Sequence, residues 1–176
     1  LFIWAMPKEL LTAGRTTTIL TYKSEGSVLS SYLKKLDVPV EVANDNQLEE
    51  AFRKKAAELI TIKDIPALSR LSLSYKGQLA GMSNSKYCRT VVNALKNLRG
   101  RQLKDVPAEN IHLYNQHLNP YVARWLEDNS RAFDDAFALT ELIRWVWRSR
   151  VRNGQSITLY LLSPRMRRLM EKWLSD

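Results

Sequence analysis

The segment IRWVWRSRVRNG, residues 143–154, places Arg144, Arg148, Arg150 and Arg152 beside two tryptophans. Arg144, Arg148 and Arg152 are spaced four apart, so on a continuous helix they would form one row. A guanidinium group keeps its charge and donates two parallel hydrogen bonds, a geometry that suits phosphate oxygens. Like charges four apart repel on an isolated helix, and a bound anion would offset that repulsion. The spacing therefore predicts a phosphate contact, with Arg150 as a further candidate for contact with nucleic acid.

A basic row near the end of a helix also has an ordinary structural explanation. Cations in the last turn interact favourably with the negative end of the helix dipole, so the row can be a solvated face. Trp145 and Trp147 flank the row, and they either are covered by another surface or pack within the fold.

A second group of candidates lies in the segment SPRMRRL, at the start of the last expected helix. Ser163 suits the N-cap, and Arg165, Arg167 and Arg168 follow in the first turns. Free N–H groups at a helix N-terminus can hold phosphate, so these residues are candidates for binding a nucleic-acid backbone, with a solvated basic face as the alternative. Ser27, after the loop KSEG, can contact a phosphate or cap its own helix, and capping is the favoured role.

The elements that position these residues follow from apolar periodicity and from stop signals. Leu139, Leu142 and Val146 share one face of a helix expected over 134–152, opposite the arginine row. Asn153 and Gly154 end it, a strand follows over 157–162, and a helix begins at Pro164.

The rest of the chain also alternates between helical and strand patterns. We expect helices over 7–13, 27–36, 46–60, 84–98 and 120–127, and strands over 16–22, 38–42, 67–75 and 111–114. This order predicts an α/β fold, a three-layer sandwich around a mainly parallel sheet.

The totals fit one soluble domain. The chain has 176 residues, a hydrophobic fraction of 45% and a net charge of +9. That charge favours a polyanionic partner, nucleic acid above all, although some proteins are merely basic. No apolar run approaches the ~20 residues that span a bilayer, and one cysteine cannot form an internal disulfide. We expect a cytoplasmic protein of a bacterial or phage-infected cell, with no membrane partner.

The tail LTELIRWVWRSRVRNGQSITLYLLSPRMRRLMEKWL resembles the C-terminal signature of helicase-like proteins in phages and integrative elements, of the DEAD/DEAH-box or superfamily 2 type. Near the amino end, ILTYKSEGSVLSSYLKKLDVPVEV resembles a strand, E-G-S loop and helix of the same family. Between these two stretches the likeness is thin.

The resemblance implies that residues 1–176 form one RecA-like lobe, the second of a helicase, without its N-terminal ATP-binding lobe. Arg148 and Arg152 would then be arginine fingers that reach ATP and Mg²⁺ on a partner lobe. Arg144 stands where the family has glutamine, a departure, and is the candidate residue for binding the nucleotide.

Motifs for holding a nucleotide are missing from the chain itself. No G-x-x-x-x-G-K-[ST] loop and no D-E-x-[DH] box occurs, so we expect ATP with Mg²⁺ only when a partner lobe supplies it. His112 and His117 lack a third ligand, and Asp134 and Asp135 suit the first turn of a helix, so no metal site is expected.

Three functions remain open from the sequence. The chain can be the second lobe of a helicase-like ATPase, with an ATP-binding RecA-like lobe or another protein as partner. It can bind nucleic acid, DNA in preference to RNA, without catalysis. It can also be a phage-encoded interaction domain that docks on an acidic protein through the same basic surface.

Overall fold

The structure is a computed structural model, and it describes residues 5–19, 21, 23–24, 26–43, 46–68, 71, 73–100 and 108–176. The chain divides into two compact units. Unit 1 comprises Leu1–Asn44 and His117–Arg144, and unit 2 comprises Asp45–Gln116 and Trp145–Asp176.

Unit 2 contains a three-stranded parallel sheet in the order β1-β3-β2. Its strands are β1 (Ile60–Lys63), β2 (Ala108–His112) and β3 (Ile157–Leu161). Every residue of the central strand β3 is buried. A strand that is covered on both faces is rich in apolar residues, which explains the run ITLYL, although Thr158 is a buried polar residue within it. The predicted α/β class with a parallel sheet is confirmed.

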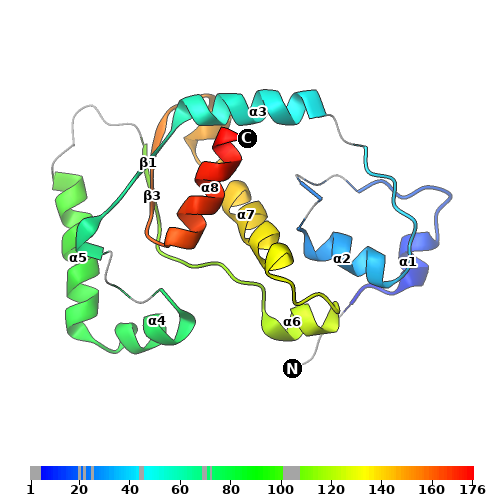
Figure 1. The fold of residues 1–176 in the computed structure, drawn as a ribbon, viewed down its shortest axis with the longest axis horizontal. Coiled ribbons are helices and arrows are strands. Elements are labelled where there is room, and N and C mark those ends of the chain that lie inside the picture. Colours follow the sequence, from blue (N-terminus) through cyan, green and yellow to red (C-terminus); the bar gives the residue numbers. More distant parts are fainter. Residues whose placement is uncertain are drawn as a thin grey trace. The chain divides into compact units, whose positions relative to one another are not determined.

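Helices cover both faces of this sheet (Figure 1). On one face, Tyr160 and Leu162 form a core with Ala94 of α5 (Ser85–Gly100) and Leu68 of the 3₁₀ turn Pro66–Leu68. Successive strand residues point to opposite faces, so Ile157, Leu159 and Leu161 face the other way. Figure 1 shows α3 (Asn46–Leu59) and α8 (Pro164–Ser175) on that side, where the two helices contact each other. A short helix, α4 (Tyr75–Met82), precedes α5.

Unit 1 is built from short helices around a small aromatic core. These are α1 (Lys8–Thr12), α2 (Val28–Lys35), α6 (Pro120–Trp125) and most of α7 (Arg131–Trp147). Leu118, Leu126 and Phe133 form the buried cluster, and Tyr32 stacks on Trp125 with 5.2 Å between ring centroids.

Local signals at two helix starts behave as predicted. The Ser27 side chain accepts a hydrogen bond from the Ser30 amide, and Ser163 accepts one from the Met166 amide. Gly154 has a φ of +73°, a left-handed conformation that glycine adopts without strain. Capping by serine therefore places the starts of α2 and α8 correctly, whereas Gly154 ends a 3₁₀ turn and not α7.

The helix expected over 134–152 is shorter than predicted, because α7 ends at Trp147. Ser149 begins a separate 3₁₀ turn, Arg150–Asn153, by accepting a hydrogen bond from the Val151 amide. A serine hydroxyl competes with the helical hydrogen-bond ladder, and here it interrupts the helix. Arg144, Arg148 and Arg152 therefore do not form one helical row.

The strands expected over 16–22, 38–42 and 67–75 are wrong in the residues that the structure describes. Val40 and Val42, for example, are 55% and 52% exposed and belong to no strand. Conversely, the helix expected over 46–60 ends at Leu59, and Ile60–Lys63 forms β1, a strand that was not expected. β-branched residues stabilise a strand only where a neighbouring strand and a packed face receive them, and local sequence does not reveal either.

Candidate nucleic-acid interface

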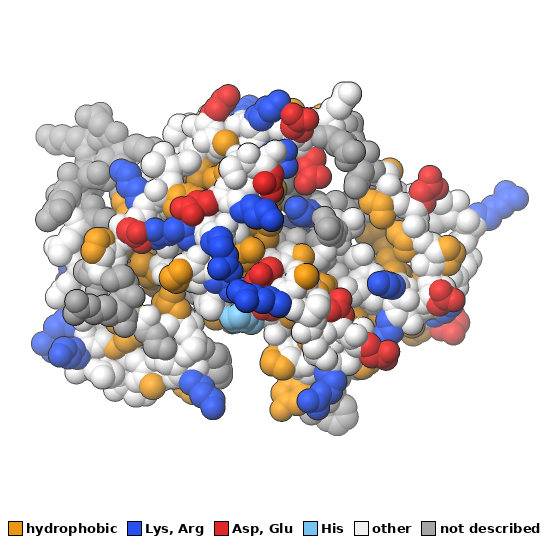
Figure 2. All heavy atoms as spheres, viewed as in Figure 1, with side chains coloured by type: hydrophobic (Ala, Val, Ile, Leu, Met, Phe, Trp, Pro, Cys, Tyr) orange, Lys and Arg blue, Asp and Glu red, His pale blue; other side chains and the backbone are white. Residues whose placement is uncertain are grey.

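The carboxyl ends of the three parallel strands meet at one edge of the sheet in unit 2, which we call the carboxyl edge. Asp64 follows β1, His112 ends β2 and Ser163 follows β3. Open α/β sheets commonly bind ligands at this edge. The helix α8 begins here, and Figure 2 shows basic side chains gathered over α8 with acidic side chains among them.

Arg167 is held by the fold at this edge. Its guanidinium group donates to both carboxylate oxygens of Asp64 and, at 2.7 Å, to the carbonyl oxygen of Leu161. The hydrogen bond from Arg167 keeps the pKa of Asp64 below its usual range, and the same bond raises the pKa of Arg167. The predicted phosphate ligand Arg167 thus already has a carboxylate partner, and this pair joins the end of β1 to the first turns of α8.

Two other candidates at the carboxyl edge are also engaged within the fold. Arg165 donates to the carbonyl oxygen of Gln116. Ser163 is only 2% exposed, and its hydroxyl donates to Asn115 Oδ1 at 2.9 Å while it caps α8. Arg168, in contrast, is exposed.

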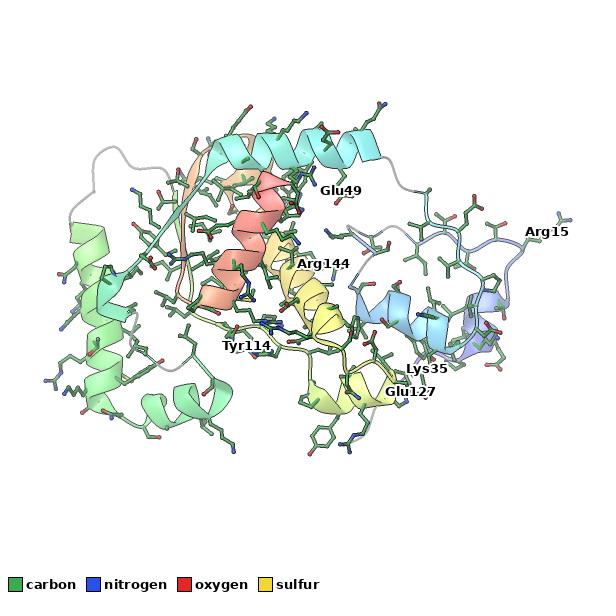
Figure 3. All side chains as sticks on the ribbon, viewed as in Figure 1. Arg15, Lys35, Glu49, Tyr114, Glu127 and Arg144 are labelled. Carbon is green, nitrogen blue, oxygen red and sulfur yellow. The ribbon has the colours of Figure 1, made fainter. Side chains whose placement is uncertain are left out.

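In unit 1, Arg144 and Ser27 likewise have partners in their own fold. Arg144, which is labelled on α7 in Figure 3, makes an ion pair with Glu141 at 2.8 Å and donates to Thr21 Oγ1 at 3.1 Å. Ser27 is 7% exposed and bonds to the Ser30 amide at 3.1 Å, the capping role favoured from the sequence.

The remaining arginines of residues 143–154 differ from Arg144 in their side-chain partners. Arg148, Arg150 and Arg152 are exposed, and none has an ion-pair or hydrogen-bond partner for its side chain among the described residues. They precede β3, and Lys55 of α3 lies beside Gly154, the residue that ends their 3₁₀ turn, because a Cβ added at Gly154 would come within 3.8 Å of Lys55 Nζ. We call Lys55, Arg148, Arg150 and Arg152 the amino-edge cluster.

The two arginine groups are therefore separated, although they are close in sequence. The amino-edge cluster precedes the first residue of β3, whereas Arg165 and Arg167 follow its last residue. A strand of five residues at ~3.3 Å per residue spans about 16 Å. One group stabilises the carboxyl edge, and the other presents free charge at the amino edge.

An exposed tryptophan adjoins the amino-edge cluster. Trp147 is 40% exposed, and its ring meets Phe52 of α3 edge to face with centroids 4.5 Å apart. Phe52 contacts Trp173 of α8 in turn, at 5.8 Å. Trp145 instead lies against the ring of His112, at 5.1 Å. Trp147 is thus partly exposed, whereas Trp145 packs within the fold.

Three residues of these sites were not singled out from the sequence: Phe52, Lys55 and Asp64. Phe52 and Lys55 are three positions apart on a predicted helix, a spacing that places them on one face. Asp64 follows ITIK directly, so recognising that strand would have placed a carboxylate at its end. Their part in this site became apparent only from the structure, in which the ring of Phe52 contacts that of Trp147.

The histidines and neighbouring acids make no cluster of three or more metal ligands in the described part of the chain. His117 Nδ1 lies 2.7 Å from Asp134 Oδ2, and the other oxygen of Asp134 accepts from the Leu118 amide at 2.8 Å. His112 is mostly buried, and this burial lowers its pKa while a hydrogen bond to the Tyr114 backbone opposes the shift.

Comparison with known proteins supports the class of fold. Residues 107–174 match a family described as the YonV C-terminal Rossmann-like domain. This segment contains β2, α6, α7, β3 and most of α8, and its two strands form the parallel sheet with β1, which lies outside the matched residues. The matched part of the chain is accordingly a Rossmann-like α/β domain.

One relative is a prophage protein. A stretch of 67 residues is 39% identical to the SPbeta prophage-derived uncharacterized protein YonV of Bacillus subtilis strain 168. The stretch covers 38% of this chain and only 16% of that relative. No solved structure matches the chain. Neither match names a helicase.

No helix in the described residues is long and apolar enough to cross a membrane.

Proposed function

We propose that this chain binds nucleic acid without catalysis, and that its amino-edge cluster contacts the phosphate backbone. One observation carries the proposal: three exposed arginines lie within five residues, and none has a carboxylate partner in the described part of the chain. Arg144 and Arg167, by comparison, both make ion pairs.

Electrostatics supports this proposal. Arg148, Arg150 and Arg152 carry like charges and have no carboxylate partner among the described residues, so they repel one another and bound phosphates would offset that repulsion. Lys55 adds a fourth positive charge from α3, and a net charge of +9 attracts a polyanion at longer range. Phosphate contacts of this kind position a nucleic acid and carry no base information directly.

Charge-matched variants test the proposal. In the first variant, Arg148, Arg150 and Arg152 are all changed to Gln. In the control, three exposed cations of α5, Lys86, Arg89 and Lys96, are changed to Gln, so both lose three charges. Affinity for a fluorescent DNA 12-mer and for the RNA of the same sequence is measured by anisotropy at 50 mM salt.

We expect the first variant to lose at least tenfold in affinity and the control to lose much less, because only the first removes phosphate contacts. Equal losses in the two variants would mean that net charge alone drives binding. No detectable binding by the unmodified chain at 50 mM salt would refute the proposal outright.

A second candidate function uses the same exposed guanidinium groups as arginine fingers. Arg148 and Arg152 can approach a nucleotide on another body because both are exposed and neither has a side-chain partner in the part of the chain that the structure describes. This function requires ATP and Mg²⁺ on a partner lobe, so the test needs a protein that carries both lobes. There, Arg148→Ala should reduce ATP turnover at least 10³-fold and leave ATP binding nearly intact. Unchanged turnover would remove Arg148 from the mechanism.

A further inference from the structure

We infer that the amino edge of unit 2 binds single-stranded nucleic acid, with a base stacked on the ring of Trp147 while the amino-edge cluster holds the flanking phosphates. This inference rests on the proposed function and specifies its ligand. It comes from the juxtaposition of one exposed indole with four cations.

The ring of Trp147 is both accessible and braced. It is 40% exposed at the last position of α7, and Phe52 supports it edge to face at 4.5 Å. Phe52 is itself held against Trp173, which is buried. A ring that is fixed before binding loses little conformational freedom when a base stacks on it.

A nucleic-acid backbone that passes the ring of Trp147 would meet the cations of the amino-edge cluster. Arg148 follows Trp147 directly, and Arg150 and Arg152 come from the next turn. Lys55 lies one helical turn beyond Phe52 on α3, so both side chains lie on the same face of that helix. On this face of α3, Glu58 lies one turn beyond Lys55 and Glu49 one turn before Phe52, and the four cations outnumber these two carboxylates.

This combination favours a single strand over a duplex. In a duplex the bases are already stacked and paired, so an indole gains nothing from them without unstacking. Unpaired bases offer a π-face to an aromatic ring, and a basic surface beside the ring follows the backbone. Every base has such a face, so the expected preference is for strandedness and not for sequence.

The first experiment uses the unmodified chain, so it does not depend on the folding of a variant. Its affinity is compared for an oligo-dT 12-mer, for an abasic 12-mer of the same length and charge, and for a duplex 12-mer. One stacked base accounts for roughly 5- to 150-fold in affinity. We therefore expect the dT strand to bind at least fivefold more tightly than the abasic strand, and more tightly than the duplex.

The second experiment changes the ring. Trp147→Ala should lower dT affinity at least fivefold and leave abasic affinity within twofold, whereas Trp147→Phe should keep most of the dT affinity. The control is Tyr114→Ala, which removes an aromatic ring of similar exposure, 38%, beyond the end of β2 (Figure 3). That control should leave all affinities unchanged.

The outcomes separate this inference from the proposed function. If the dT and abasic strands bind equally well to the unmodified chain, stacking on Trp147 is refuted while backbone binding stands. A loss of dT affinity in Trp147→Ala that Trp147→Phe does not restore also overturns the inference. If no nucleic acid of any kind binds, the proposed function fails as well.

Discussion

At the scale of single residues, the arginines of this chain differ in the hydrogen-bond and ion-pair partners of their guanidinium groups. Arg167 holds Asp64 and the end of β3, and Arg144 holds Glu141. Arg148 and Arg152 are exposed and have no such partner among the described residues. Charge alone therefore does not identify a binding residue. An arginine that already has a carboxylate partner has a structural role, whereas an exposed arginine without one is available to a ligand.

The partly buried imidazole of His112 leads to a prediction about pH. Burial lowers its pKa in the folded state, so below a pH of about 6.5 the unfolded chain binds more protons than the folded chain. His112 thus costs no stability at pH 7.5, and the cost grows as the pH falls through the unfolded pKa toward the folded one.

We expect the thermal midpoint of the unmodified chain to fall between pH 7.5 and pH 5.5, and to fall less in His112→Phe, which keeps a ring against Trp145. His117 is present in both proteins, so the comparison isolates the effect of His112. An equal decrease in the two would show that His112 does not cause the acid sensitivity.

At the scale of elements, short polar residues and glycines decide where the helices end. Ser149 and Gly154 bound the 3₁₀ turn that carries Arg150 and Arg152. If α7 continued through this segment, Arg148 and Arg152 would share its face with Arg144, which is held in unit 1. The break in the helix therefore separates the available arginines from the engaged one.

Two glycines with positive φ provide a comparison at this scale. Gly154→Ala places a Cβ in open space beside Lys55, so its cost is mainly the left-handed backbone, about 1–2 kcal/mol. Gly26→Ala has the same backbone cost, and its Cβ would also lie 2.6 Å from the Ala136 backbone carbon.

We therefore expect Gly26→Ala to destabilise unit 1 by clearly more than Gly154→Ala destabilises unit 2. Urea unfolding, followed by hydrogen exchange resolved for each unit, measures both losses. Equal losses would mean that the backbone at Gly26 moves away from Ala136 at little cost.

At the scale of the whole molecule, the sequence predicted the class of fold better than the layout of the sheet. Most of the helices, β3 and the caps at Ser27 and Ser163 were readable because each depends on residues a few positions apart, although α4 was not predicted. The strand β1 was not, because the same β-branched character occurs at Thr16–Ile19, which forms no strand.

The candidate site was predicted in part for the same reason. The sequence predicted phosphate contacts for Arg148, Arg150 and Arg152, and these contacts remain a prediction. It also proposed Arg167, but the carboxylate that holds this arginine lies 103 positions earlier in the chain. Local spacing carries no information about such a partner, so the division of the arginines into two groups required the structure.

The salt dependence of nucleic-acid binding tests the central claim most directly. Affinity of the unmodified chain and of the variant with Arg148, Arg150 and Arg152 changed to Gln is measured for a single-stranded 12-mer between 50 and 200 mM salt. Each phosphate contact contributes about 0.7 to the log–log slope for a single strand. We expect a slope that is smaller by about 2 in the variant, and identical slopes would contradict a phosphate-binding role for these arginines.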